Sequence, residues 1–416
     1  MSYQIAIIGA GVSGLTAAIH LESLGYSVHI YDQNTHIGGR LQSVAFDGYT
    51  LDVGFQVLLE EYPMVKKYLD VAALEMQYFE SGAYIFNNQK SYVLGNFLNN
   101  PSLLWKTVIA DIATLTDKIK ILKLANRLKN TSIDTIFQSP EMTTRDYLRF
   151  YGFSESIIDH FFRPFFSGVF LDTQLDTSSR QFEFTLKMFY EGKVGIPKKG
   201  IQEVALQLAS KLKSSSVNLG KKVQQIQGNN ISFENDQMEH ADYIIVTSNI
   251  DRMLPNLGES TIKWSGTENL YFTVSPEYVF DKKLIGLVSS KSGAIINSIC
   301  FPDTYKANEQ QLSLLSVSIV KKHDFTDYQL IQHVKRELKE HFNIEVTKYL
   351  TTFQVSKALP EFFNLQNNYD PSECQITENI FLAGDTMLNP SLNAAMRSGE
   401  LAAQAIHQKI TGIVGL

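Results

Sequence analysis

Short apolar runs alternate with helical apolar spacings at both ends of the chain. Residues Tyr3 to Ile8 form an apolar run of strand length, and a helical spacing follows from Leu15 to Leu24. Ser27 to Tyr31 indicates the next strand. Near the other end, Asn379 to Ala383 predicts a strand, and Leu392 to Ile406 predicts a helix rich in small residues. Runs of this kind are typical of strands buried on both faces, so the pattern predicts an α/β fold.

The middle of the chain has a different pattern, which predicts helices first and strands later. Helical spacing covers Pro101 to Ile112, Asp117 to Leu128, Thr143 to Phe150 and Glu155 to Phe162. Strand-like runs follow at Asn269 to Val274, Ala294 to Ile299 and Leu312 to Val320, before an amphipathic helix from Leu330 to Phe342. We therefore expect one domain from residues 1–60, 191–260 and 371–416. Residues 61–190 and 261–370 are expected to form a second domain with a helical part and an antiparallel sheet.

The segment from residue 201 to residue 247 predicts a helix followed by a small sheet. Ile201 to Lys213 has helical spacing. Val217 to Ile226, Ile231 to Phe233 and Ala241 to Thr247 then alternate as strands do, and we expect them to pair in one sheet.

A glycine-rich turn joins the first predicted strand to the first predicted helix. Gly9 permits a tight turn, Gly11 lets the backbone approach a pyrophosphate, and Gly14 lets helix and strand pack closely. The helix start, which includes Ser13, offers free N–H groups and a positive dipole end to phosphates. Asp32 follows Gly14 by 18 residues, where a carboxylate would accept hydrogen bonds from an adenosine ribose. This context predicts a dinucleotide site, and by itself it is compatible with NAD and with FAD.

Composition and charge exclude several classes of function. The 416 residues include 37 basic and 43 acidic side chains, so the formal net charge is −6. This balance argues against nucleic acid as a partner, because no basic surplus is present to neutralise phosphates. A hydrophobic content of 44% excludes a disordered chain. The only cysteines are Cys300 and Cys374, so neither a disulfide framework nor a cysteine zinc site is expected, and a cytoplasmic location fits.

Other kinds of site and segment are not indicated either. No pair of histidines has metal-ligand spacing with a third partner, so no metal is expected. A Gly-x-Ser-x-Gly nucleophile motif is missing from the sequence. The uncharged stretch before Glu22 has no preceding basic residue and is interrupted by glycines, so neither a signal peptide nor a membrane anchor is expected.

The segment after the glycine-rich turn carries a more specific signature. Asp32 is followed by Gly38-Gly39-Arg40 and then by Asp52-Val-Gly54. This pattern resembles the N-terminal signature of the flavin amine oxidase superfamily, which includes protoporphyrinogen oxidases, phytoene desaturases and carotene isomerases. The resemblance implies a Rossmann-like FAD-binding domain of the GR2 type, with an inserted α+β substrate domain. It also implies that the loop of Gly38, Gly39 and Arg40 lies along the FAD, with the arginine near the pyrophosphate and the flavin.

The closing segment resembles the end of the same flavoproteins. In relatives an aspartate, here Asp385 after Gly384, bonds the ribitol chain. The N-terminus of the last helix, here the backbone around Ala395 and Met396, points at N1 and the C2 carbonyl of the flavin, where it stabilises negative charge. The resemblance also implies that Val223 meets the adenine through its backbone. Two cofactor segments at opposite ends of the chain favour FAD over NAD, and since neither cysteine falls inside the closing motif, we expect it to bind non-covalently.

The phenylalanine-rich run from Phe161 to Phe170 has two interpretations. Its aromatic side chains either form a core or line an apolar tunnel, and core packing carries at least equal weight because buried aromatic residues are mostly structural. As a motif, Arg163-Pro164-Phe165-Phe166, with Ser178-Ser179-Arg180 further on, resembles the desaturase-like branch of the superfamily.

Together, these features predict an FAD-dependent oxidoreductase that transfers hydride from a substrate C–H to flavin N5 and dehydrogenates a large apolar substrate such as a polyene or isoprenoid. An FAD-dependent amine oxidase and a redox-silent flavoprotein isomerase stay open as alternatives. Amine oxidases often carry an aromatic residue near Pro390-Ser391-Leu392, and a lysine where this chain has Glu268 and Asn269, although Lys263 is close. No residue is assigned as a catalytic acid or base.

The resemblance also implies peripheral membrane contact, because desaturase-like relatives take substrates from lipid. The segment from Tyr92 to Ile112 is expected either to lie in a membrane interface or to pack as a helix over the substrate cavity. The second expectation is favoured, since the polar face lacks a Lys/Arg cluster.

Overall fold

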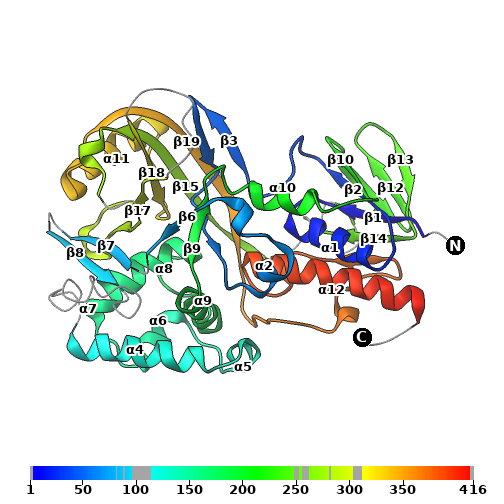
Figure 1. Ribbon diagram of the computed structural model, residues 1–416, viewed down its shortest axis with the longest axis horizontal. Helices are drawn as coiled ribbons and strands as arrows, with labels where there is room; N and C mark the ends of the chain where they lie inside the picture. Colours follow the sequence, from blue (N-terminus) through cyan, green and yellow to red (C-terminus); the bar gives the residue numbers. More distant parts are fainter. Residues whose placement is uncertain are drawn as a thin grey trace.

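A parallel sheet brings together strands from both ends of the chain (Figure 1). The computed structural model describes residues 3–80, 82–87, 90–95, 114–247, 253–254, 262–280, 283–302 and 312–412. The sheet has the order β10-β2-β1-β14-β20, and each neighbouring pair is parallel. Its strands are β1 (Ile5–Ile8), β2 (Val28–Asp32), β10 (Ser216–Leu219), β14 (Tyr243–Val246) and β20 (Ile380–Leu382). The predicted α/β class is confirmed.

Both faces of this sheet are covered, which explains its short apolar strands. In β1, Ile5 and Ile7 belong to the core shared with α1 (Val12–Ser23), α10 (Glu203–Ala209) and α12 (Leu392–Thr411). Ala6 and Ile8 point the other way, toward a three-stranded sheet of β11 (Val223–Gln227), β12 (Asn230–Phe233) and β13 (Met238–His240). Burial on two faces requires apolar residues at every position of the strand.

The prediction of a single small sheet between residues 217 and 247 is wrong. Strands β10 and β14 join the parallel sheet, and only β11, β12 and β13 form a separate antiparallel one. The helix is also shorter than the one predicted from Ile201 to Lys213: α10 spans Glu203–Ala209. Alternating residues predict a strand but carry no information about its neighbours, and β14 is placed by its pairing with β1 and β20.

A second, larger sheet has the order β19-β15-β18-β17-β16-β7-β8. Its strands are β7 (Gly82–Asn87), β8 (Lys90–Gly95), β15 (Lys263–Val274), β16 (Ile285–Val288), β17 (Ile296–Cys300), β18 (Ser313–Ile319) and β19 (Val346–Glu361). One face packs against α11 (Asp327–Phe342). The pairs are antiparallel except for β16 with β7, so the sheet is mixed. The boundaries proposed for the two domains stay a prediction.

The remaining elements lie between and beside the two sheets (Figure 1). The helices are α2 (Pro63–Tyr68), α4 (Leu115–Lys129), α5 (Ile133–Gln138), α6 (Thr144–Phe150), α7 (Glu155–Ile157), α8 (Arg163–Phe170) and α9 (Ser179–Glu191), with a π-helical turn at Ile158–Phe162. The strands are β3 (Ser43–Phe46) with β4 (Tyr49–Asp52), and β5 (Leu58–Leu59) with β9 (Val194–Pro197) and β6 (Met76–Phe79).

The predicted membrane segment is only partly described. Tyr92 to Gly95 belong to strand β8, which pairs with β7. The rest of that segment, including the helix predicted from Pro101 to Ile112, lies outside the described residues. Within the described ranges, no helix combines the length and the apolar character needed to cross a bilayer.

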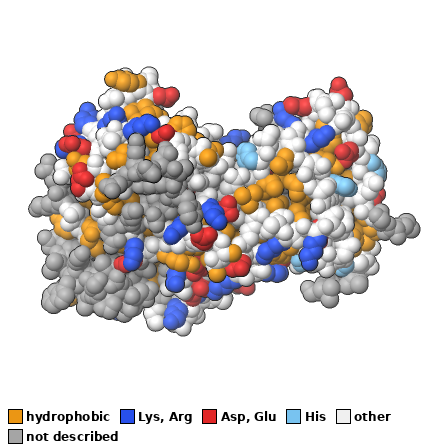
Figure 2. All heavy atoms as spheres, turned by 45° about the horizontal axis from the view of Figure 1, so that its top comes forward, with side chains coloured by type: hydrophobic (Ala, Val, Ile, Leu, Met, Phe, Trp, Pro, Cys, Tyr) orange, Lys and Arg blue, Asp and Glu red, His pale blue; other side chains and the backbone are white. Residues whose placement is uncertain are grey.

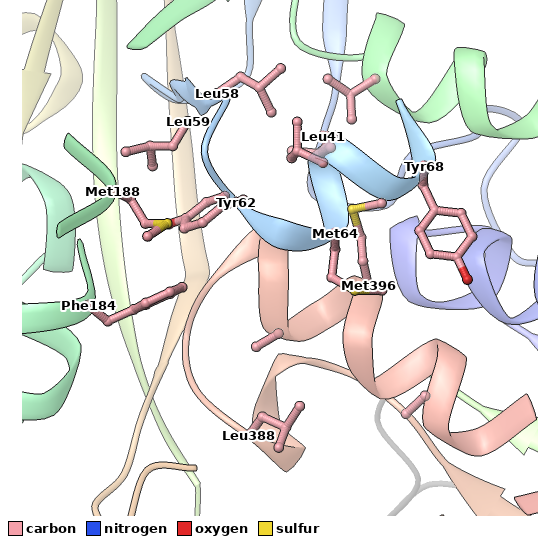
Figure 3. Packing of buried hydrophobic residues seen from close by; sticks show 14 of the residues in the cluster. Leu41, Leu58, Leu59, Tyr62, Met64, Tyr68, Phe184, Met188, Leu388 and Met396 are labelled. Carbon is pink, nitrogen blue, oxygen red and sulfur yellow. The ribbon is translucent and has the colours of Figure 1, made fainter. Parts of the chain in front are cut away.

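The centre of the molecule is a continuous apolar core that ties α2, α9 and α12 together (Figure 3). The rings of Tyr62 and Phe184 stack with centroids 5.5 Å apart. Figure 3 also shows Met64 of α2 beside Met396 of α12. At the rim of this core, the buried carboxylate of Glu400 accepts hydrogen bonds from Tyr68 at 2.6 Å and from Lys67 and Arg397. In the space-filling view, the surface is hollowed between two raised parts, and hydrophobic side chains are visible in the hollow (Figure 2).

Candidate active site

One large cavity lies between the parallel sheet and the mixed sheet. Its volume of about 1960 Å³ is roughly twice the upper end of the 300–1,000 Å³ usual for a single small-molecule pocket. The wall includes the turn after β1, the start of α12, parts of β15, β17 and β19, and one side each of α8 and α9. The cavity is therefore large enough for a long cofactor together with a second ligand.

The glycine-rich turn presents its main chain to this cavity. Gly9, Gly11 and Ser13 all line the wall. Gly11 is the N-cap residue of α1, and no side chain caps this helix. The first N–H groups of α1 are therefore free to bind an anion. A Cβ atom built on Gly11 meets no atom within 4 Å, so the space in front of the helix start is open.

Gly14 and Asp32 support this turn in different ways. Gly14 does not line the wall; a Cβ atom there would overlap the main-chain oxygen of Gly9, so a glycine is required for α1 to approach β1. Asp32 lines the cavity, and its carboxylate accepts hydrogen bonds from the N–H groups of Ala10 (2.7 Å) and Asn34 (2.8 Å). These two bonds orient the carboxylate and leave lone pairs for a ligand hydroxyl.

Val223, at the start of β11, lines the cavity near Asp32. The main-chain N–H of Lys221 donates to the Asp32 carbonyl at 2.7 Å, which ties β11 to the end of β2. Lys221 and Lys222 line the cavity as well. This end of the cavity therefore combines exposed main chain with two basic residues.

Arg40 and Asp385, predicted as separate cofactor contacts, bind each other. The guanidinium donates to both carboxylate oxygens at 2.6 and 2.8 Å, and a further bond at 2.9 Å reaches the Ala358 carbonyl. The aspartate side chain is 6% exposed and the arginine side chain 41% exposed. Trp264 adds a ring 5.5 Å from the guanidinium. The pair thus joins two segments 345 residues apart, inside the cavity wall.

The start of α12 forms the facing part of the wall. Ser391 caps the helix by accepting the N–H of Ala394 at 3.0 Å. Gly384 and Ala395 line the cavity, and the Gly384 N–H donates to Ser398 in the first turns of α12 at 2.8 Å. Met396, the other predicted residue, is fully buried in the central core and does not line the cavity (Figure 3).

The phenylalanine-rich run combines both sequence interpretations. Phe162, Phe166 and Phe170 are 7% exposed or less, and the first two pack on Phe182 of α9. Phe161 and Phe165 are half-buried, stack at 5.6 Å, and line the cavity. All five phenylalanines border the cavity, and they differ in burial: one helical stripe is buried in the core, whereas the neighbouring stripe is only half-buried.

Of the positions expected to matter for amine chemistry, the three on β15 lie away from the cavity. Asn269 is fully buried and bonded to Ser316 and Ser318, and Glu268 faces His323 at 3.4 Å. Neither residue lines the cavity, and neither does Lys263. Pro390, Ser391 and Leu392 do line it, without an aromatic ring.

Two buried titratable groups, Asp52 of the predicted motif and Cys300, lie away from the cavity. Asp52 accepts hydrogen bonds from Ser43 Oγ (2.6 Å) and from the Ile201 N–H (2.9 Å). Burial raises the pKa of Asp52 to about 6, against the opposing effect of these two bonds. Burial also raises the pKa of the Cys300 thiol to about 12, and neither Cys300 nor Cys374 lines the cavity. Among the described residues, no group of three or more His, Cys, Asp or Glu side chains could hold a metal ion.

Sequence reasoning missed several residues of the wall. Trp264 and Ala358 contact Arg40 from strands of the mixed sheet. Asn297 and Ser298 of β17 line the apolar end. A tryptophan is rare enough in this chain to attract attention, since only two occur, but nothing in the sequence places either strand beside the glycine-rich loop.

Comparisons with known proteins identify relatives of this chain. It is 28% identical to protoporphyrinogen oxidase 2 of Arabidopsis thaliana over 170 residues, which are 40% of this chain and 32% of that protein. It is 32% identical over 120 residues to the 4,4'-diapophytoene desaturase of Staphylococcus aureus strain bovine RF122, covering 29% of this chain and 22% of that protein. The chain thus matches about a third or less of the length of these relatives.

Solved structures resemble the whole chain. An oxidoreductase from Methanosarcina mazei superposes with a TM-score of 0.71 at 14% identity, covering 96% of this chain and all of that one. Putrescine oxidase bound to putrescine gives 0.70 at 14% identity, covering 98% and 99% of the two chains. Residues 12–407 match the family described as flavin containing amine oxidoreductase, and the chain therefore belongs to that family.

Proposed function

We propose that the cavity binds FAD without a covalent bond. Family membership implies a flavin, and the wall offers what an FAD molecule requires. The uncapped start of α1 suits the diphosphate, Asp32 suits a ribose, and the start of α12 suits the electron-rich edge of the ring. The predicted contacts Gly9, Gly11, Ser13, Asp32, Gly39, Arg40, Val223, Gly384, Asp385 and Ala395 all border the cavity, whereas Gly14 and Met396 act through packing.

We further propose that the protein is an oxidoreductase that dehydrogenates a large apolar substrate such as a polyene or isoprenoid. When bound, the flavin supplies a two-electron acceptor that takes a hydride from a substrate C–H at N5, while a proton leaves the adjacent carbon. The chain's own residues bind and orient the substrate and keep water away. Phe161, Phe165 and Phe189 are suited to this task, since their rings pack on one another along the cavity wall.

The continuity of the cavity carries this proposal. One space extends from the free N–H groups of α1 to the aromatic rings of α8 and α9, so a long cofactor and an apolar ligand share it. The name of the related desaturase gives its substrate as 4,4'-diapophytoene, a lipophilic polyene, which agrees with an apolar substrate. Amine oxidation is less well supported, because Glu268, Asn269 and Lys263 do not line the cavity.

Anaerobic titration of the purified holoenzyme tests the proposal. Isoprenoids and polyenes are added, in parallel with a panel of primary, secondary and polyamines, while the absorbance of the bound flavin is recorded. We expect bleaching by members of the apolar panel. Bleaching by amines alone would establish an amine oxidase, and turnover of an apolar ligand without any bleaching would establish a redox-silent isomerase. Protein that takes up no FAD would refute the whole assignment.

A further inference from the structure

A β-bulge turns two polar side chains toward the apolar end of the cavity. Strand β17 shifts its register against β18 between Ile296 and Ser298, so Asn297 is the extra residue of the bulge. Successive residues of a regular strand point to opposite faces. Here, however, Asn297 and Ser298 both line the cavity. Bulges of this kind re-aim side chains beside binding sites.

The amide of Asn297 is oriented by helix α8. Its Nδ2 donates to the main-chain carbonyl of Pro164 at 3.2 Å. The amide packs so closely on the helix that a Cβ atom at Gly168 would lie 2.7 Å from Nδ2. Because a carbonyl can only accept, this bond determines which end of the amide is nitrogen. The oxygen Oδ1 is therefore an acceptor, and it has no partner among the described residues.

The side chain of Ser298, at the next position, also lacks a hydrogen-bond partner among the described residues. It is 5% exposed and Asn297 is 8% exposed, so both side chains are almost removed from solvent. No described residue bonds the Ser298 hydroxyl. In contrast, its cross-strand neighbour Ser318 donates to Asn269 at 3.0 Å and does not line the cavity. Both polar groups face the cavity, so they are free to bond a ligand there, and a purely apolar ligand would bury them unpaired at a cost in free energy.

We propose that Asn297 and Ser298 bind a hydroxyl group on an otherwise apolar substrate. This inference rests on the proposed function and names a chemical class within it. A hydroxyl donates one hydrogen bond, to Asn297 Oδ1, and accepts another, from Ser298 Oγ. One N–H of Asn297 Nδ2 bonds Pro164, and the second N–H and the Ser298 hydroxyl carry no positive charge to offset the burial of a carboxylate. An ammonium would need a negative charge, which neither side chain carries. The substrate is therefore a long-chain alcohol rather than a plain hydrocarbon.

A binding experiment tests this directly. Tritiated all-trans-geranylgeraniol and its methyl ether are dialysed to equilibrium against the oxidised holoenzyme, because the ether keeps the chain but cannot donate. We expect the alcohol to bind about 2- to 12-fold more tightly, the range that one net hydrogen bond supplies. Asn297→Leu and Ser298→Ala should remove this preference. The matched control Ser318→Ala, a serine one strand away that is 6% exposed, should retain it.

Thermal unfolding of the apoproteins provides the second measurement. Ser298→Ala should leave the melting temperature unchanged or raise it, whereas Ser318→Ala should lower it by breaking the bond to Asn269. Equal binding of alcohol and ether by the wild type, or a preference that persists in Asn297→Leu and Ser298→Ala, would overturn the inference and leave the proposed function standing. Failure of either probe to bind would overturn the apolar substrate class as well.

Discussion

Gly11 offers a way to separate folding from cofactor binding in a single substitution. Its φ of −77° and ψ of 177° are accessible to alanine. The added methyl group meets no protein atom within 4 Å, because it extends into the cavity in front of α1. Replacement of glycine stiffens the unfolded chain, whereas alanine is a poorer N-cap than glycine. Because these two effects oppose each other, we expect the free energy of unfolding to change by less than about 1 kcal/mol.

Binding of FAD should respond differently to Gly11→Ala. The methyl group occupies the position from which a phosphate would reach the free N–H groups of the helix. Loss of one hydrogen bond to a charged group amounts to about 1.5–3 kcal/mol, which corresponds to an about 10- to 150-fold weaker FAD complex. The dissociation constant can be measured by titrating FAD into stripped apoprotein and following the quenching of flavin fluorescence.

Gly25→Ala is the matched control at the other end of the same helix. Gly25 has a φ of 90° and open space around its Cα, so alanine strains the backbone by about 1–2 kcal/mol without touching the cavity. This variant should lose stability and keep its FAD affinity, the opposite of Gly11→Ala. If Gly11→Ala bound FAD within twofold of the wild type, the start of α1 would not hold the diphosphate.

Three further outcomes follow from the packing and the charges. Glu400→Gln should lower the free energy of unfolding at pH 7 by about 2–3 kcal/mol in urea, because its basic partners lose a buried carboxylate; a change below about 0.5 kcal/mol would contradict this. Burial raises the pKa of Asp52 to about 6, so the protonated carboxyl contributes fully to stability below pH 4 and this contribution declines as the pH rises to 6. The decline in the free energy of unfolding is at most about 3 kcal/mol. Urea unfolding between pH 4 and pH 7 should show that Asp52→Asn removes it. Gly399→Ala should cost about 1–3 kcal/mol and lower the melting temperature, since its Cβ atom would overlap the main-chain oxygen of Ser13; an unchanged melting temperature would show that α1 and α12 separate freely.

The sequence by itself determined the elements whose causes are local. The apolar run before the glycine-rich turn became β1, and the small-residue pattern after residue 391 became α12, because burial and helical period are written into consecutive residues. The glycine positions were also readable, since the close approach of Gly14 to Gly9 needs only the turn itself. For the same reason, the resemblance at the two chain ends led to the correct family.

Tertiary structure alone decided which of these elements meet. The partners of β14, the pairing of Arg40 with Asp385, and the lower burial of Phe161 and Phe165 all depend on segments distant in the sequence. The bulge at Asn297 likewise depends on the register of β18. A sequence pattern reports whether a residue prefers to be buried or exposed, but the free energy of a hydrogen bond or an ion pair belongs to two groups at once, and their distance is set only when the whole chain has packed.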